Sequence, residues 1–300
     1  EKYDEWKDDK IMINDVMRFL DNVLTDFIER APEQFDDAKY SAEKERSVGL
    51  GVMGFHSYLQ QHSIPLESVM SKAWNKKIFK HIQEHVDQAS KDLADERGAC
   101  PDAADYGYNE RFSNKTAIAP TASISIICGG ASPGVEPVAA NSYTHKTLSG
   151  SFSVRNRYLV ELLEKHGKNT DDVWSGITTN QGSVSHLDFL TDLEKDVFKT
   201  AFELDQKWII ELSGDRTPYI SQAQSINLFV PADIHKRELH KIHFDAWKKG
   251  LKSLYYCRSK SIQRAENVND TKATDVTANV YKSKPQTTEQ PEYEECLSCQ

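Results

Sequence analysis

This sequence lacks both the long apolar runs of a membrane protein and the dense cysteines of a disulfide-stabilised one. No segment approaches the ~18 consecutive apolar residues that a membrane-spanning helix needs. Five cysteines among 300 residues argue against a disulfide scaffold and favour the reducing cytoplasm. The first residues have neither the apolar region of a signal peptide nor an initiator Met, so we expect a processed or excerpted piece of a longer chain.

The sequence also lacks a long basic run, and its formal net charge is −9. Because duplex nucleic acid binds positively charged surfaces, it is not an expected partner. The length is enough for one large domain or two ordinary ones. Residues 265–300 are polar, with few apolar side chains. We therefore expect two parts, a folded region over 1–264 and a disordered tail over 265–300.

Apolar periodicity predicts three helices. Residues 9–30 carry an apolar stripe at helical spacing, and a long polar helix is expected over 71–97, ended by a glycine. A third helix is predicted over 191–212, because Thr191 and Glu194 form a capping-box pattern at its start and apolar residues continue along one face.

A βαβ pattern occurs near the end of the folded region. Residues 225–230 predict a strand, 231–250 a helix and 251–257 a second strand. Such a unit implies that the two strands are parallel. Residues 116–119 predict another short buried strand. Because helices and strands alternate elsewhere too, an α/β fold is the expected class.

Three glycines at positions 49, 51 and 54 match the spacing of a dinucleotide-binding loop. We reject that interpretation, because polar and charged residues at 40–46 precede the first glycine where a hydrophobic strand is required. No second strand ending in an acidic residue follows at the required distance. Glycines that let a strand or helix pack closely are the better explanation.

A loop of small hydroxyl residues follows the strand predicted at 116–119. In the sequence from Ala119 to Ser125, hydroxyl groups and free backbone amides at a turn or helix N-terminus make an anion site, typically for phosphate. The alternative is a simple helix N-cap, which Thr and Ser supply routinely and which composition alone favours. The glycine-rich segment 129–134 and the following Glu136 indicate a backbone that approaches another group closely.

Tyr255 and Tyr256 lie at the end of the second strand of the predicted βαβ unit. Adjacent strand residues point to opposite faces, so one Tyr is expected in the core and the other at the edge. The chemical alternative is a redox relay, since a phenol can lose an electron and a proton together and pass the hole to its neighbour. Periodicity does not distinguish the two.

Cys296 and Cys299 lie within the last five residues, with two residues between them. A disulfide between them would close no useful loop. We therefore interpret the pair as a dithiol at the end of a flexible tail, which reaches a site inside the protein and then a partner protein. One such pair without further ligands is weak evidence for zinc, and no metal site is expected. Cys100, Cys128 and Cys257 are interpreted as small buried hydrophobes.

Six short motifs taken together indicate a family, although no single one is specific. In chain order they occupy residues 46–51 (RSVGLG), 119–123 (APTAS), 134–137 (GVEP), 223–228 (AQSINL), 254–256 (LYY) and 295–300 (ECLSCQ). The whole resembles the C-terminal part of the large (alpha) subunit of a class I ribonucleotide reductase of a bacterial or phage type. The resemblance extends over essentially all of the sequence.

The resemblance implies that the chain is the C-terminal part of a ten-stranded α/β barrel that binds a ribonucleoside diphosphate. It also reverses the preference for a simple N-cap, because in this family the hydroxyl loop binds the substrate phosphates. The residues that match this phosphate-binding loop are Pro120, Thr121, Ala122, Ser123 and Ile124.

The resemblance further implies that Tyr255 and Tyr256 relay a radical from the small (beta) subunit. Cys296 and Cys299 match the tail thiols that reduce the active-site disulfide after each turnover. Thioredoxin or glutaredoxin then restores these thiols by thiol–disulfide exchange.

Other parts of the family pattern have no match in this sequence: the catalytic thiyl cysteine, the Asn and Glu beside it, both active-site redox cysteines and the N-terminal regulatory region. The chain therefore resembles half of an enzyme, either a naturally split subunit or a fragment. The resemblance implies nucleotide effectors on the missing N-terminal portion, a radical metallocofactor on the small subunit and no cofactor bound directly by this chain. Two alternatives stay open, a non-catalytic reductase-binding or scaffold fragment and a thiol oxidoreductase that uses the tail pair.

Overall fold

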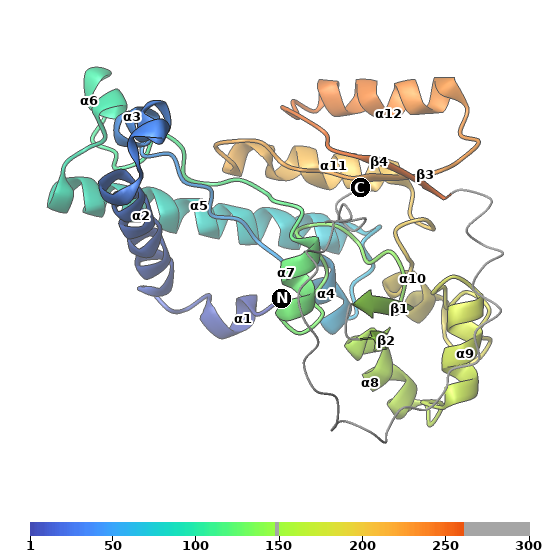
Figure 1. Cartoon of the computed structure of the whole chain (residues 1–300). Helices are drawn as coiled ribbons and strands as arrows, with labels where there is room; N and C mark the ends of the chain where they lie inside the picture. The colour runs from blue at the N-terminus through green and yellow to red at the C-terminus, as the bar shows by residue number, and fades with distance from the viewer. Residues whose placement is uncertain (148–149, 261–300) are drawn as a thin grey trace, which may run out of the picture. The chain divides into compact units, whose positions relative to one another are not determined.

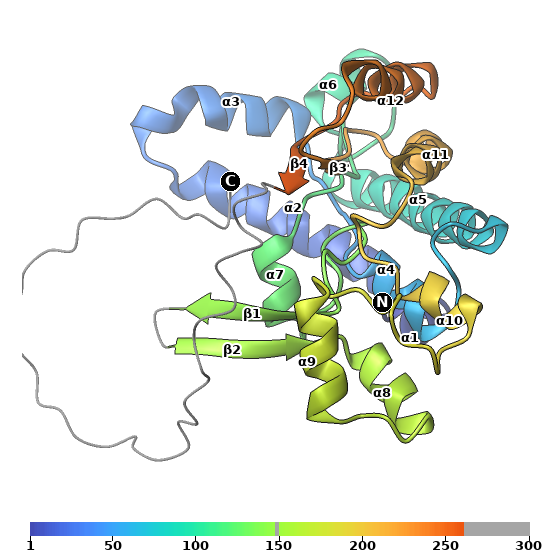
Figure 2. The same cartoon turned by 90° about the vertical axis from the view of Figure 1, so that its right-hand side faces the viewer.

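The computed structural model describes residues 1–147 and 150–260. The segment Glu1–Lys260 forms one compact unit, drawn in Figures 1 and 2. Its elements are α1 (Tyr3–Trp6), α2 (Met12–Arg30), η1 (Glu33–Phe35), α3 (Asp36–Glu45), α4 (Phe55–Gln61), α5 (Val69–Arg97), α6 (Pro101–Asp105), α7 (Ala122–Ile127), β1 (Ser142–Thr147), β2 (Gly150–Arg155), α8 (Arg157–Lys165), α9 (Asp171–Thr179), α10 (Asp192–Val197), α11 (Gln206–Arg216), η2 (Thr217–Tyr219), β3 (Leu228–Pro231), α12 (Lys236–Lys248) and β4 (Cys257–Lys260).

A parallel arrangement of extended segments positions the loops discussed below. Leu50 forms a parallel bridge with Thr116, and Ile118 forms one with Gln224. Beyond this second bridge the chain continues into β3, which pairs in parallel with β4. The expected α/β class with parallel pairing is therefore confirmed. The strand predicted at 116–119 is present only as these isolated bridges.

The predicted βαβ unit is confirmed as β3–α12–β4, but its second strand begins later than predicted. We expected that strand over 251–257, whereas β4 begins at Cys257. The amide of Tyr256 donates to Oδ1 of the Asn227 side chain at 3.1 Å. The amide of Asn227 in turn donates to the Glu136 carboxylate at 3.1 Å. Backbone bonds also join the two segments here, from the amide of Tyr255 to the carbonyl of Ile226 at 2.8 Å and from the amide of Leu228 to the carbonyl of Tyr256 at 2.9 Å. The side chain of Asn227 therefore adds to the backbone pairing just before β4.

The third predicted helix is in fact two helices, α10 and α11. The capping box of Thr191 and Glu194 is present at the start of α10. The chain then leaves the helical path, because the amide of Ala201 donates to the carbonyl of Val138 at 2.8 Å. The side chain of Asp205 caps a new helix, α11. Apolar residues of the intervening turn are buried, which explains why their periodicity alone predicted one continuous helix.

The other two predicted helices are confirmed as α2 and α5. The hydroxyl of Ser68 caps α5 by accepting from the amide of Ser71 at 3.1 Å, and Gly98, at φ 87°, follows its last residue. Both α2 and α11 contact α5, and in Figure 1 α11 runs along α5 whereas α2 crosses its left-hand end. The main apolar core forms around this long helix.

A second apolar cluster lies beside the antiparallel β1–β2 hairpin. Its buried members come mainly from α8, α9 and α10 and include Leu159, Leu163, Trp174, Ile177 and Val197. Within the described residues, no helix combines the length and the apolar character needed to cross a bilayer.

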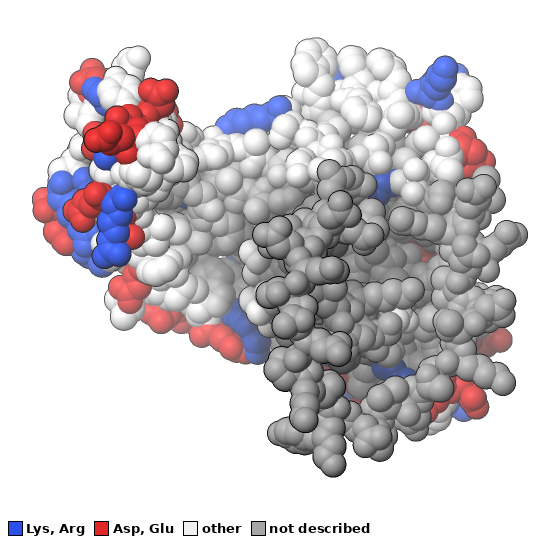
Figure 3. Space-filling model, in the orientation of Figure 1, with Lys and Arg blue, Asp and Glu red and all other residues white. Residues whose placement is uncertain are grey.

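One buried carboxylate with three arginines joins α2, the end of α3, α5 and the segment after α6. Asp21 is fully buried and accepts from Nε of Arg46 at 2.9 Å, a terminal nitrogen of Arg97 at 2.7 Å and Nε of Arg111 at 2.9 Å. Burial by itself would raise the pKa of Asp21, but the arginine hydrogen bonds and charges outweigh it and hold the pKa below its usual value. Figure 3 shows acidic and basic side chains mixed over this end of the unit.

We predict that Asp21→Asn lowers the free energy of unfolding by about 3–5 kcal/mol, because three arginines lose their buried counter-charge. Urea denaturation at neutral pH measures this loss. Because the folded-state pKa of Asp21 is depressed, its stabilisation is complete above the ordinary carboxyl pKa and disappears as the pH falls through the folded-state value. The difference between parent and variant should therefore shrink in acid. Asp15→Asn, on the exposed face of the same helix, is the control, and equal losses in the two variants would contradict the prediction.

Candidate functional site

The hydroxyl loop, residues 120–124, leads from the parallel segments into α7. Thr121 has a left-handed conformation (φ 54°) and precedes α7, but its side chain makes no capping bond. Its hydroxyl instead accepts from the amide of Gly134 at 2.7 Å. The simple N-cap interpretation therefore fails for Thr121. The first-turn amides of α7 have no capping side chain, and Ala122, Ser123 and Ile124 are exposed.

A second loop, residues 129–137, lies directly against the hydroxyl loop. Gly134 has φ 48°, and a Cβ atom there would lie 2.8 Å from the carbonyl oxygen of Ala119 and 3.5 Å from that of Pro120. A position that requires both positive φ and close backbone contact suits only glycine. The expected close approach of this segment is thus an approach to the hydroxyl loop.

The glycines at 49, 51 and 54 also have close neighbours. A Cβ atom on Gly51 would lie 2.5 Å from the carbonyl oxygen of Ala117, which belongs to the adjacent parallel segment. This geometry supports close packing rather than a dinucleotide-binding loop.

Tyr255 and Tyr256 lie next to each other in space as well as in sequence. Their ring centroids are 4.1 Å apart, with an angle of 54° between the ring planes. The expectation that one of them is buried is wrong, since their side chains are 50% and 41% exposed. Both lie just before β4, and neither belongs to an apolar cluster of the described residues. Two accessible phenols in contact have the geometry that a relay requires.

Asn227 connects the tyrosine pair to the second loop. Its amide and its Nδ2 donate to the two carboxylate oxygens of Glu136, each at 3.1 Å, and its Oδ1 accepts from the amide of Tyr256. Both Glu136 and Asn227 are buried, and burial raises the pKa of the Glu136 carboxyl. The sequence motifs did not indicate a role for Asn227. The available signal was a single amide side chain inside the apolar run 225–230.

The cysteines fall into three groups. Cys100 is fully buried, as expected. Cys128 and Cys257 are exposed, so their interpretation as buried hydrophobes is wrong. Both lie at the ends of elements, after α7 and at the start of β4, where no core packs over them. Cys296 and Cys299 lie outside the described residues, and their proposed role stays a prediction.

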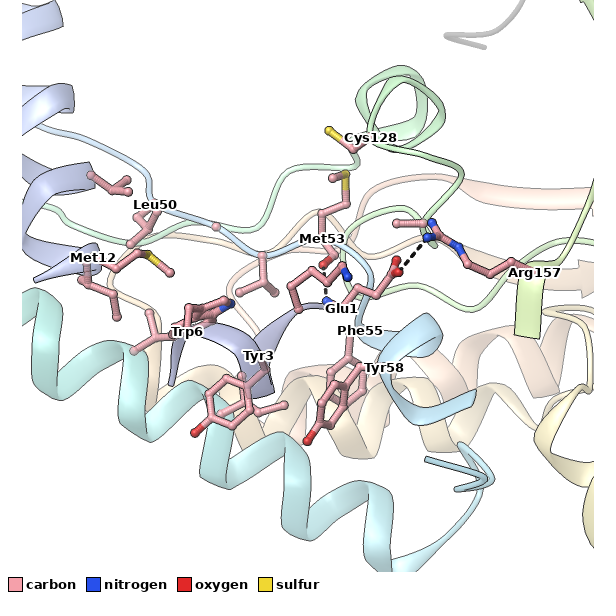
Figure 4. A pocket seen from close by; sticks show the side chains of 18 residues that line it. Glu1, Tyr3, Trp6, Met12, Leu50, Met53, Phe55, Tyr58, Cys128 and Arg157 are labelled. Atoms are coloured by element: carbon pink, nitrogen blue, oxygen red, sulfur yellow. Dashed lines mark hydrogen bonds and ion pairs between the residues drawn. The ribbon is translucent and has the colours of Figure 1, made fainter. Parts of the chain in front are cut away.

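A cavity lies next to the second loop, from which Ala131 contributes to its lining. It has a volume of about 420 Å³ and is lined mainly by apolar side chains of α1, α2, α5 and the segment 50–53. Figure 4 shows Tyr3, Trp6, Tyr58, Met53 and Cys128 around it. None of the predicted phosphate-binding or tyrosine-relay residues lines this cavity. The described residues contain no group of three or more His, Cys, Asp or Glu side chains placed to hold a metal ion.

Comparison with known proteins identifies the family. A model of the ribonucleotide reductase barrel domain matches residues 2–110 and 102–257, and the chain belongs to this family. The ribonucleoside-diphosphate reductase large subunit of Invertebrate iridescent virus 6 is 50% identical over 273 residues, covering 90% of this chain and 28% of that protein. The corresponding subunit of Invertebrate iridescent virus 3 is 44% identical, over 91% of this chain and 43% of the relative.

A solved structure agrees with this assignment. The alpha subunit of the class Id ribonucleotide reductase of Actinobacillus ureae superposes with a TM-score of 0.81 at 39% identity, over 88% of this chain and 49% of that chain. The resemblance and the reductase-barrel fold inferred from the motifs are therefore confirmed. The chain spans only between about a quarter and a half of the length of these relatives.

The contact between the two loops leads to a stability prediction. Gly134→Ala should lower the free energy of unfolding more than Gly130→Ala. Both glycines have positive φ, so both variants incur a left-handed strain of about 1–2 kcal/mol. Only at position 134 does the new methyl group also meet a backbone oxygen, since nothing lies within 4 Å of a Cβ atom at Gly130. Urea denaturation of the two variants measures the difference. Equal decreases in the free energy of unfolding would show that the two loops are not in close contact at Gly134.

Proposed function

We propose that this chain is the C-terminal portion of a ribonucleoside-diphosphate reductase alpha subunit. It contributes a phosphate loop, a tyrosine relay and a dithiol tail to the radical-based reduction of ribonucleoside diphosphates to deoxyribonucleoside diphosphates for DNA synthesis. The main support is the 50% identity over 90% of this chain to a ribonucleoside-diphosphate reductase large subunit. The low cysteine content is typical of the cytoplasm, where we expect it to act.

The hydroxyl loop is the proposed site for the substrate diphosphate. The first-turn amides of α7 have no intrahelical acceptors and point toward the start of the helix, where an anion is favourably placed. Ser123 offers an exposed hydroxyl beside them. Thr121, whose hydroxyl accepts from the amide of Gly134, holds the loop in its shape without occupying these amides.

The tyrosine pair is the proposed radical relay. In each step one tyrosyl radical takes an electron and a proton from the neighbouring phenol, so that the radical moves by one ring and the first phenol is restored. The centroid separation of 4.1 Å places Tyr255 and Tyr256 in contact. Asn227 accepts a hydrogen bond from the backbone of Tyr256 and also binds Glu136. It thereby holds the tyrosine pair in a fixed position relative to the second loop.

The remaining components belong to partners. We propose that an N-terminal portion of the alpha subunit supplies the catalytic thiyl cysteine, the redox cysteines and the nucleotide-effector sites. The small (beta) subunit supplies the radical through its metallocofactor, and thioredoxin or glutaredoxin restores the tail thiols. One observation supports an upstream partner: among the described residues, the amides of Gly49 and Gly51 have no hydrogen-bond acceptor, although Leu50 between them is paired. A free strand edge of this kind binds another strand.

Reconstitution tests the proposal. The chain is mixed with a polypeptide that supplies the upstream part of a related alpha subunit, a matching small subunit and thioredoxin, and reduction of CDP is measured. Formation of dCDP supports the proposed function. A stable complex that makes no dCDP would instead support a non-catalytic reductase-binding fragment.

In this reconstituted enzyme, Tyr255→Phe or Tyr256→Phe should abolish turnover, because phenylalanine has no O–H group to give up an electron and a proton together. Binding of the nucleotide should remain, since neither side chain belongs to the hydroxyl loop. Tyr108→Phe, at an exposed position, is the control and should keep full activity. Retained CDP reduction in either relay variant would remove the relay from the proposal.

The double variant Cys296→Ser, Cys299→Ser should stop repeated turnover driven by thioredoxin, because the tail can no longer carry electrons to the inner disulfide. A small dithiol that reaches the inner cysteines directly should restore part of the activity. Cys128→Ser, which changes an exposed cysteine of the described residues, should have no effect. Full thioredoxin-driven activity in the double variant would contradict the shuttle.

A further inference from the structure

A buried tyrosine and a histidine form a hydrogen-bonded pair away from the proposed relay. Tyr3 of α1 is only 4% exposed, and its hydroxyl oxygen lies 2.8 Å from Nδ1 of His81 on α5. Burial lowers the pKa of His81, so the imidazole is neutral at physiological pH. With its proton on Nε2, Nδ1 accepts the phenol O–H and is the base for that proton.

Aromatic rings surround this pair. The ring centroid of Tyr3 lies 5.0 Å from that of Trp6, 6.0 Å from that of Tyr58 and 6.5 Å from that of Trp74. These are distances of ordinary ring contact. A hole that arrives on any of these rings can therefore pass to Tyr3 without crossing solvent.

Tyr3 differs from its aromatic neighbours in having an imidazole as its hydrogen-bond partner. Oxidation of a phenol makes its proton strongly acidic, so the oxidised state is stabilised where a base already accepts that proton. The Nδ1 atom of the neighbouring His85 lies 2.9 Å from the backbone carbonyl of His81, to which it donates as Nδ1–H. Of these two histidines, His81 is thus the partner of Tyr3.

We propose that Tyr3 and His81 form a proton-coupled oxidation site. A protein-based thiyl or tyrosyl radical takes one electron from Tyr3 while the phenol proton moves to Nδ1 of His81. The products are a neutral tyrosyl radical at position 3, an imidazolium at position 81 and the thiolate or phenolate of the oxidant. Return of one electron, together with the proton from His81, restores the pair. This activity goes beyond the proposed reduction and rests on it for the oxidising radical, whereas the oxidation of Tyr3 itself can be tested without any reductase partner.

The location gives the site a protective role. Met12, Met53 and Cys128 line the same cavity as Tyr3 and Trp6, as Figure 4 shows. Oxidation of methionine or cysteine sulfur adds oxygen and needs a separate repair reaction. Tyr3 instead returns to its resting state by regaining one electron and one proton. A stray radical in this region is therefore diverted from the sulfur atoms to a reversible site.

The test uses the full 300-residue chain without any reductase partner, so its outcome is independent of turnover. The chain is oxidised by photogenerated ruthenium(III) tris-bipyridine and examined by electron paramagnetic resonance after the short-lived surface radicals have decayed. We expect a persistent tyrosyl signal, because the oxidised ring is buried. Tyr3→Phe should abolish it. Tyr58→Phe, which alters a buried neighbour 6.0 Å away, should leave it unchanged.

Two further measurements address the proton. His81→Gln keeps a hydrogen-bonding side chain but removes the base, and should abolish the persistent signal, whereas His85→Gln should retain it. In the parent chain, formation of the signal should be slower in D2O than in H2O. A persistent signal of equal size in Tyr3→Phe or His81→Gln, or the same rate of formation in both solvents, would overturn the proposal.

Discussion

The backbone pairing between parallel segments is the constraint on which the rest of the unit depends. The bridges from Leu50 to Thr116 and from Ile118 to Gln224, and the ladder between β3 and β4, fix the order and direction of the extended segments. Parallel segments need long connections, and the helices α4 to α6, α7 to α11 and α12 supply them. The hydroxyl loop follows directly after one bridge, so its position is set by the pairing rather than by its own sequence.

Side-chain amides and carboxylates add a second set of hydrogen bonds to this framework. Asn227 joins Glu136 to the backbone of Tyr256, and Asp21 joins three arginines from different parts of the chain. In each case a buried polar group is satisfied by hydrogen bonds, as burial requires. The first set holds two candidate functional loops together, and the second joins helices at the far end of α5. Neither set involves residues that are close in sequence.

The sequence predicted local structure well and long-range contacts poorly. The end of α5 followed from Gly98, whereas its start at Val69 lies two residues before the predicted one. The βαβ unit followed from apolar runs separated by a helical pattern. The break between α10 and α11 was missed because it depends on a bond from Ala201 to distant Val138. The exposure of both tyrosines was missed as well, because the alternation of a strand predicted one buried ring. The family was recognised from motifs, while the pairing of Tyr3 with His81 had no sequence signal, since 77 other residues separate them.

The free amides of Gly49 and Gly51 have a consequence for how such a protein evolves. A strand that docks there is recognised through main-chain groups, which every amino acid except proline provides equally. The glycines present no side chains that would demand a particular complement. A polypeptide that pairs at this edge can therefore change most of its side chains and keep the same backbone pairing.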